Sequence, residues 1–253
     1  MFAEIQAALR TLCEKEQMTL LFACESGSRA WDFPSLDSDY DVRFIYHKDP
    51  RFYFRLNRDR DHFDAMLPND LDISGWDLPK ALNLFHQGNV ALFEWLQSSI
   101  VYFADDIFCT QLRKLIPDYF NPRKAVYHYL ALAKNAEMNK ADDGTVRYKK
   151  LFYRLRALCA AHYVELRREM PPTSLRKVLE AHLEPQQVCG VIEEWTERKA
   201  RSTEADRLAL PDWVETWLSG LESHLEECVS VLPIARRKDF DPLNELVLTT
   251  LGV

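Results

Sequence analysis

Two aspartates separated by a single residue, Asp39 and Asp41, have the type and spacing to bind a metal ion. They stand at the start of an apolar run, Val42 to Tyr46, that is typical of a buried strand. Side chains two residues apart on a strand project from the same face. Because neighbouring carboxylates repel each other, they need a cation between them, and Mg²⁺ prefers such oxygen ligands. The pair therefore predicts a magnesium site at the beginning of a strand.

A Gly-Ser pair, Gly27 and Ser28, precedes Asp39 with ten residues in between. It follows a second apolar run, 18–24, so we expect a buried strand to end in a turn that opens a short helix. Gly27 lets the backbone pass close to a ligand because it has no Cβ. Ser28 brings a hydroxyl and an N–H to the start of the helix, where unpaired amides favour a phosphate. A phosphate-bearing ligand beside the metal is the expected result.

This arrangement, Gly27-Ser28, ten residues, then Asp39-x-Asp41, is similar to the signature of the DNA polymerase β-like nucleotidyltransferase superfamily. The fuller strings 25–31 and 37–46 resemble a narrower bacterial family, the YcgL-type predicted nucleotidyltransferases, which includes members associated with RNA-repair ligases. The likeness extends over residues 71–82, 88–98 and 149–156. Such signatures often carry a glycine shortly after Gly-Ser, where this chain has Asp32.

The resemblance implies transfer of a nucleoside monophosphate. A hydroxyl attacks the α-phosphorus of a nucleoside triphosphate, and pyrophosphate leaves from the other side. Two Mg²⁺ ions, with Mn²⁺ as a substitute, suit this reaction: one lowers the pKa of the hydroxyl and the other neutralises the leaving phosphates. Two ions usually need three carboxylates, so a third acid is expected on an adjacent strand.

Asp72 is the predicted third carboxylate. In the run 71–74, Leu71 and Ile73 would face the core, and Asp72 would lie on the opposite side. The resemblance also places the third acid of the family just before the Gly-Trp pair here. Asp64 and Asp70 remain alternatives, because Asp70 shares the face of Asp72 and Asp64 lies in a neighbouring run.

Two arginines close to the signature are candidate nucleotide-binding residues. Arg43 shares the strand face of Asp41, where a guanidinium could contact a phosphate or form an ion pair that positions the aspartate. Both interpretations stay open. Arg29 could be a solvated helix residue, and the family resemblance favours a role in the site.

Two further basic residues come from the second half of the chain. Lys150, Tyr153 and Arg156 are spaced to share roughly one face of a helix predicted over 146–169. Lys150 and Arg156 are therefore candidates to bind the triphosphate, with Lys149 as an alternative to Lys150. A solvated basic face is the competing interpretation.

Composition limits the class of protein. The 253 residues are 47% hydrophobic and 28% charged, as in ordinary globular proteins, and the formal charge of −7 argues against coating nucleic acid by bulk electrostatics. The six cysteines form no Cys-x-x-Cys pair, and the sequence predicts no His/Cys cluster and no zinc site. We expect no signal peptide and no membrane-spanning stretch, and hence a cytoplasmic protein.

The pattern of elements predicts an α+β protein: a small mixed sheet with helices, similar to the palm of polymerase β, followed by an all-α domain. Strands are expected at 18–24, 40–46 and 71–74 after an amphipathic helix over 2–17. From Pro122 onward we expect no strand. The predicted helices in this half are 123–141, 146–169, 173–183, 186–200 and 211–231. The composition changes near residues 117–122, which divides the chain into a catalytic domain, 1–120, and a helical domain, 121–253, that binds nucleotide and acceptor.

The sequence predicts a magnesium-dependent nucleotidyltransferase. The resemblance favours an RNA end as acceptor, such as a damaged tRNA 3′ end. A protein or small-molecule hydroxyl is an alternative acceptor, and the acidic net charge favours it mildly. A third alternative is a nucleotide or RNA sensor without catalysis. The sequence determines neither the preferred nucleotide nor the oligomeric state.

Overall fold

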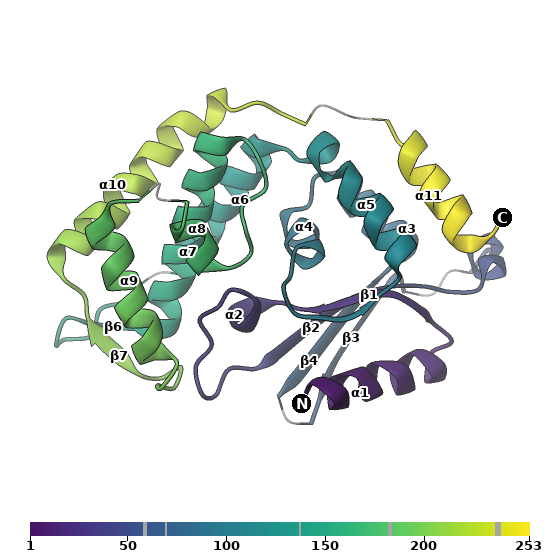
Figure 1. Ribbon diagram of the computed structural model, residues 1–253, viewed down its shortest axis with the longest axis horizontal. Coiled ribbons are helices and arrows are strands. Elements are labelled where there is room, and N and C mark those ends of the chain that lie inside the picture. Colours follow the sequence, from purple (N-terminus) through teal and green to yellow (C-terminus); the bar gives the residue numbers. More distant parts are fainter. Residues whose placement is uncertain (58–59, 69, 137, 182–183, 236–238) are drawn as a thin grey trace. The chain divides into compact units, whose positions relative to one another are not determined.

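The computed structural model describes residues 1–57, 60–68, 70–136, 138–181, 184–235 and 239–253 (Figure 1). The chain forms two compact units, which are described separately. The sheet unit contains residues 1–27, 39–119 and the described part of 237–253; the helical unit contains residues 28–38 and the described part of 120–236. Among the described residues, every helix is too short or too polar to cross a bilayer.

The sheet unit is a five-stranded mixed sheet with helices on both faces (Figure 1). Its strand order is β3-β4-β2-β1-β5, in which β2 and β4 are parallel and the other neighbours are antiparallel. In chain order its elements are α1 (Phe2–Lys15), β1 (Thr19–Glu25), β2 (Tyr40–His47), η1 (Pro50–Phe54), β3 (His62–Leu67), β4 (Leu71–Asp77), α3 (Leu78–His86), α4 (Val90–Leu96), β5 (Val101–Ala104), α5 (Asp106–Tyr119) and α11 (Asp241–Leu251). The predicted α+β class and the strands around the signature are confirmed.

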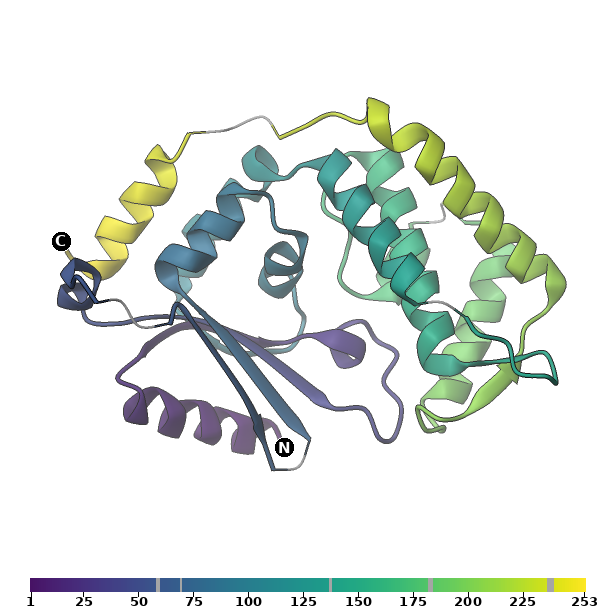
Figure 2. The same ribbon diagram turned by 180° about the vertical axis from the view of Figure 1, so that it is seen from behind.

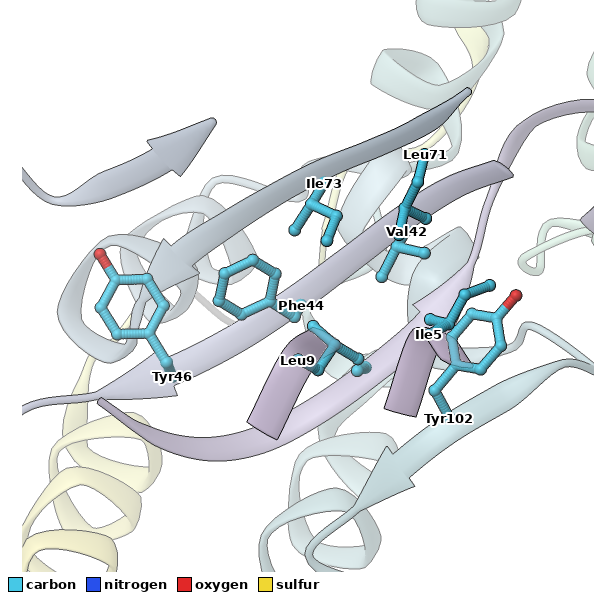
Figure 3. Packing of buried hydrophobic residues seen from close by; sticks show 9 residues of the cluster. Ile5, Leu9, Val42, Phe44, Tyr46, Leu71, Ile73 and Tyr102 are labelled. Carbon is cyan, nitrogen blue, oxygen red and sulfur yellow. The ribbon is translucent and has the colours of Figure 1, made fainter. Parts of the chain in front are cut away.

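The core beneath α1 follows from the alternation along β2 and β4. Val42, Phe44 and Tyr46 point to one face, where they pack with Leu71 and Ile73 against Ile5 and Leu9 of α1 (Figure 3). The alternate residues of both strands therefore lie on the opposite face. This confirms the predicted orientation of β4, with Leu71 and Ile73 in the core and Asp72 on the other side.

Turns and caps of this unit agree largely with their sequence signals. Asp77 caps α3 by accepting a hydrogen bond from the Leu78 N–H at 2.9 Å. Gly88 separates α3 from α4 with a φ of +71°. The sequence predicts a helix that is capped by Asp105 or Asp106, runs through Leu115 and is stopped by Pro117. Its end was predicted wrongly, because Pro117 lies inside α5, which continues to Tyr119.

The helical unit contains the short helix α2 (Gly27–Ala30), whose first residue belongs to the sheet unit. Among the described residues it also contains five further α-helices, one 3-10 helix and a two-stranded ribbon (Figure 2). These elements are α6 (Pro122–Asn135), β6 (Thr145–Arg147), α7 (Tyr148–Arg167), α8 (Leu175–Leu179), α9 (Gln186–Lys199), β7 (Arg207–Ala209), α10 (Asp212–Cys228) and η2 (Val229–Val231). The expectation of no strand after Pro122 was wrong, because β6 and β7 pair antiparallel. Helix α7 begins at Tyr148 since the ribbon takes the residues before it.

Two segments group with the unit on the other side of the predicted boundary at 120/121. The segment Ser28–Ser38, between Gly27 and Asp39, belongs to the helical unit. There the N–H of Leu175 donates to the carbonyl oxygen of Trp31 at 3.0 Å, and the N–H of Leu36 donates to that of Ser202 at 2.9 Å. Conversely, α11 packs on α3 and α5 of the sheet unit. One boundary in the sequence therefore cannot separate the two units, because each unit includes a segment from the other side of residue 120.

Candidate active site

Asp41 and Asp72 lie side by side at the start of two neighbouring strands. The parallel pairing of β2 with β4 places Asp41 directly opposite Asp72. Both side chains project from the face opposite the α1 core, because Val42 and Ile73, the next residues along, point into that core. The sheet thus brings together two acids that are 31 positions apart in the sequence, as their numbers show.

Arg43 bridges these two carboxylates. Its Nη2 donates to Asp41 Oδ1 at 2.9 Å and to Asp72 Oδ2 at 2.8 Å. Its Nη1 donates to the carbonyl oxygens of Val42 at 3.1 Å and Asp72 at 3.2 Å. The side chains of Arg43, Asp41 and Asp72 are 18%, 24% and 33% exposed. Of the two interpretations left open for Arg43, this geometry shows the ion pair, with one guanidinium compensating two partly buried negative charges.

Asp39 is located one residue before β2, which begins at Tyr40. The N–H of Tyr40 donates to the carbonyl oxygen of Asp70 at 2.9 Å, which fixes where the strand starts. Asp39 is exposed. The sequence prediction that placed both aspartates within a strand holds for Asp41, whereas Asp39 lies just outside it.

The two rivals of Asp72 have other local roles. Asp64 lies opposite Ser74 in the pairing of β3 with β4 and accepts a hydrogen bond from its hydroxyl at 2.5 Å. Asp70 occupies the turn before β4 with a φ of +54°, a left-handed conformation that aspartate tolerates better than most residues. Register with Asp41 and the shared guanidinium favour Asp72 over both.

Gly27 is required by the position of the Asp41 carboxylate. Gly27 has a φ of +58°, and a Cβ added to it would lie 2.0 Å from Asp41 Oδ2. No side chain fits at that distance. The glycine therefore has two functions, since it adopts a left-handed turn and lets the carboxylate pack against the backbone.

Ser28 and Arg29 belong to a compact segment that follows Gly27. Ser28 is buried, and its carbonyl oxygen accepts a hydrogen bond from the Phe33 N–H at 3.0 Å. Nη2 of Arg29 donates to the carbonyl oxygen of Ser38 at 2.7 Å, which ties the two ends of the segment together. Because α2 has only four residues, any attraction for a phosphate comes from individual amides and not from a long helix dipole.

The aspartate at position 32 has a structural explanation. Asp32 adopts a φ of +65°, the left-handed conformation that glycine adopts without strain. The departure from the family pattern is therefore conservative for the backbone, since aspartate is among the side chains that tolerate this region.

Lys199 anchors the same segment and was missed by sequence reasoning. Its side chain is buried in the helical unit, where Nζ donates to the carbonyl oxygen of Phe33 at 2.7 Å and contacts Ser35 Oγ at 3.3 Å. Burial lowers the pKa of this ammonium from 10.5 to about 8. A lysine near the end of a predicted amphipathic helix gives no signal of such a role.

Glu25 was also missed, although it ends the strand that leads into the signature. It is fully buried, its Oε1 accepts the backbone N–H of Asp41 at 2.9 Å, and its Oε2 accepts the hydroxyl of Tyr102. The pairing of β1 with β2 ends at Glu25 opposite Val42. The glutamate side chain thus replaces the missing strand partner of Asp41. The available signal was an acid at the end of an otherwise apolar run.

Lys150 and Arg156 lie in different surroundings and do not share one exposed face. Lys150 is exposed and borders a polar pocket of about 230 Å³ together with Asn139, Arg147 and Arg207. Arg156 is 1% exposed, and its guanidinium lies 4.5 Å from the centre of the Trp31 ring. Its Nε donates to the carbonyl oxygen of Thr173 at 3.4 Å. This position supports a packing role for Arg156 and leaves no surface for contact with a nucleotide.

The donor set at Asp39, Asp41 and Asp72 fits a hard divalent cation. All three offer carboxylate oxygens, the ligands that Mg²⁺ prefers, and a cationic group already bridges two of them. Their ligand atoms do not converge within 4.8 Å of one another; among the described residues only Glu165, His224 and Cys228 do so, in the helical unit. Binding of an ion between Asp41 and Asp72 therefore requires Arg43 to withdraw from at least one of them.

The chain is similar to known proteins over nearly its whole length. Residues 1–249 match the family described as RNA repair pathway DNA polymerase beta family. A relative from Bacillus subtilis (strain 168), named uncharacterized protein YcgL, is 35% identical over 243 residues, which cover 96% of this chain and 94% of that protein. A crystal structure of a nucleotidyltransferase-like protein from Exiguobacterium sibiricum 255-15 covers 98% of this chain and 80% of its own, with 12% identity and a TM-score of 0.32.

Proposed function

Since the chain belongs to the RNA repair pathway DNA polymerase β family, we propose that it is a magnesium-dependent nucleotidyltransferase that acts on an RNA end. Membership confirms the resemblance seen at residues 27–41 and makes the chain a relative of polymerase β-like nucleotidyltransferases linked to RNA repair. The substrates, the metal and the roles of individual residues are our proposal.

The observation that carries this proposal is the in-register pair Asp41 and Asp72 bridged by Arg43. A purely structural sheet has no need for two partly exposed carboxylates at adjacent strand starts, where their repulsion must be compensated. With Asp39 beside them in the sequence, they are the three acids that would hold Mg²⁺. The bound Mg²⁺ would activate the acceptor hydroxyl and neutralise the triphosphate.

The residues of the chain then have distinct roles. The 3′ hydroxyl oxygen of the RNA forms a bond to the α-phosphorus, and the bond from that phosphorus to the bridging oxygen of pyrophosphate breaks. Asp72, the more exposed of the strand pair, accepts the hydroxyl proton. Arg43 exchanges its contact with Asp41 or Asp72 for the phosphate, since a guanidinium binds both groups in the same planar geometry. Gly27 and Ser28 offer backbone amides to the triphosphate.

Lys150 remains a proposed anion-binding residue, and its surroundings support that role. Arg147 and Arg207 border the same pocket, so three cationic side chains surround a space of about 230 Å³. We propose that this pocket binds phosphates of the nucleotide or of the RNA backbone. A cluster of cationic side chains attracts phosphates despite the net negative charge of the chain. Arg29 supports the site by closing the segment that ends at Ser38.

The test is label transfer from each α-labelled nucleoside triphosphate, with Mg²⁺, to an RNA pool and a cell-protein pool in parallel. We expect label in RNA, and a loss of roughly 100-fold or more in Asp41→Asn and Asp72→Asn, as for removal of one preorganised charged group. Asp64→Asn is the matched control, because it removes an acid of the neighbouring strand that has its own partner in Ser74.

The remaining outcomes discriminate among the alternatives. Label in protein would refute the RNA acceptor while leaving the transferase chemistry intact. Equal losses in Asp64→Asn and Asp72→Asn would refute the assignment of Asp72. Magnesium-dependent binding of triphosphate without transfer to either pool would refute both acceptors and favour a small-molecule acceptor or a sensor.

A further inference from the structure

Three side chains with metal-binding atoms converge between α7 and α10 of the helical unit. Glu165 comes from α7, and His224 and Cys228 lie one turn apart on α10, so their side chains share a face. One ligand atom from each lies within 4.8 Å of the other two. The two helices pack side by side (Figure 2). The expectation of no His/Cys cluster was therefore wrong, because His and Cys four residues apart are completed by a distant glutamate.

Glu165 provides a second, independent observation. Its Oε2 is buried and accepts no hydrogen bond from the described residues, although most buried carboxylate oxygens have a partner. This oxygen faces Nε2 of His224 at 4.0 Å, which is too far for a hydrogen bond. The other oxygen, Oε1, lies 3.8 Å from Nη2 of Arg168. One oxygen thus lies next to a counter-charge, while the other points at the histidine and cysteine.

We propose that Glu165, His224 and Cys228 form a binding site for a zinc ion. Imidazole nitrogen, thiolate sulfur and carboxylate oxygen are the three ligand types that zinc accepts, and three protein ligands leave a fourth tetrahedral position for water. Magnesium is excluded as the occupant because it avoids sulfur and nitrogen. A thiolate and a carboxylate together neutralise the two positive charges of the ion.

The surroundings allow an ion to enter and hold the ligands in place. His224 is 55% exposed, so the cluster is open to solvent on one side. The thiol of Cys228 lies 3.6 Å from the carbonyl oxygen of Leu225, a weak contact that leaves the sulfur available once its proton is lost. Arg168 Nη2 lies 3.8 Å from Oε1 of Glu165, so a positive charge stands beside the oxygen that does not face the histidine.

The zinc site is distinct from the magnesium chemistry proposed for the sheet unit. Its ligands are softer, and all come from the helical unit. An ion there would join α7 to α10, which already share the ion pair of Arg154 with Glu222 at 2.5 Å. The inference does not depend on the proposed function, since zinc binding is measured without any nucleotide.

Binding is tested with full-length, tag-free protein freed of metal by a chelator. Titration with Zn²⁺ against a chromophoric competitor should give one tight site per chain. Replacement by Co²⁺ should give a thiolate-to-cobalt charge-transfer band, which carboxylates alone do not produce. Cys228→Ser should abolish this band, and His224→Gln should weaken zinc binding by at least about tenfold, the loss seen even for residues that only support a ligand.

Cys189→Ser is the matched control, because Cys189 is another half-buried helical cysteine whose sulfur contacts a carbonyl oxygen, that of Glu184. It should leave both signals unchanged. If Cys228→Ser does not fold, alkylation of the wild-type protein decides the matter: Zn²⁺ should protect Cys228 and not Cys189, as mapped by mass spectrometry. Absence of a stoichiometric zinc site, a charge-transfer band that survives without Cys228, or equal alkylation of both cysteines would overturn the proposal.

Discussion

Replacing Gly27 by alanine tests the close approach between the turn and the Asp41 carboxylate. The new Cβ would lie 2.0 Å from Oδ2 and 2.9 Å from Cγ of Asp41, whereas ordinary contacts begin at 3.4 Å. The carboxylate must therefore retreat by more than 1 Å. Because φ at this position is +58°, alanine also adopts a left-handed conformation that costs about 1–2 kcal/mol.

These two costs are separated by a matched control. Gly144 has a φ of +77°, and a Cβ added there would meet no atom of the described residues within 4 Å. Gly144→Ala should therefore lose only the conformational term of about 1–2 kcal/mol. Gly27→Ala should lose more stability than the control and, since a misplacement of about 1 Å can lower a rate about 100-fold, nearly all transferase activity.

Chemical denaturation and label transfer measure the two effects. Gly27 lies in the sheet unit and Gly144 in the helical unit, so each variant is compared with the wild-type protein in the unfolding transition of its own unit. Similar losses of stability in the two variants, together with wild-type activity in Gly27→Ala, would refute the argument. That result would mean that Asp41 has space to move and that its carboxylate position is not set by the glycine.

Substitutions at three further positions test the supports of the site. Glu25→Ala removes the acceptor of the Asp41 N–H and of the Tyr102 hydroxyl. It should lower the free energy of unfolding, measured by urea titration, by about 1–3 kcal/mol for each donor left without a partner. An unchanged free energy of unfolding would contradict a supporting role. Asp32→Gly should change the free energy of unfolding by less than about 1 kcal/mol, because glycine adopts the φ of +65° at this position without strain. Asp32→Val should lower the free energy of unfolding by about 1–2 kcal/mol. A valine variant that melts at a higher temperature than the glycine variant would disprove the conformational argument. Burial lowers the pKa of Lys199 from 10.5 to about 8, so between these pH values the unfolded chain keeps a proton that the folded chain has released. Wild-type stability should therefore rise by about 1.4 kcal/mol per pH unit relative to Lys199→Met, and parallel pH profiles would exclude the shift.

The strand pattern made half of the site predictable. Alternation of apolar and polar residues placed Val42, Leu71 and Ile73 in the core, which fixed the opposite orientation of Asp41 and Asp72. The register between β2 and β4 is a long-range property that the sequence does not give. The choice of Asp72 rested on its strand face, which Asp70 shares, and on the family resemblance. Pairing with Arg43 was one of two interpretations, because local spacing shows that Arg43 and Asp41 are neighbours and not which group the guanidinium selects.

The contacts that the sequence could not reveal join residues far apart in the chain. Lys199 holds the backbone of Phe33 across 166 positions. Glu165 meets His224 and Cys228 only because α7 and α10 pack together. Neither contact is visible in the periodicity of the sequence. A polar residue on a predicted helix is taken as solvent-exposed when its partner is unknown. The burial of Arg156 could not be predicted for the same reason. In the sequence, an arginine that packs on Trp31 does not differ from an arginine on an exposed helix face.

The constraints on Asp41 argue for a function rather than for stability. Its N–H is held by the buried Glu25, its carbonyl oxygen accepts the N–H of Ser26 at 2.8 Å, and its carboxylate lies between Gly27 and Arg43. Burying a glutamate to hold one backbone amide and one tyrosine hydroxyl is costly, and an apolar strand end would stabilise the sheet more. Such an arrangement gains its value from fixing one carboxylate within a fraction of an ångström, which is what a metal-assisted phosphoryl transfer requires. The support around Asp41 is therefore the part of the molecule whose loss should harm catalysis more than folding.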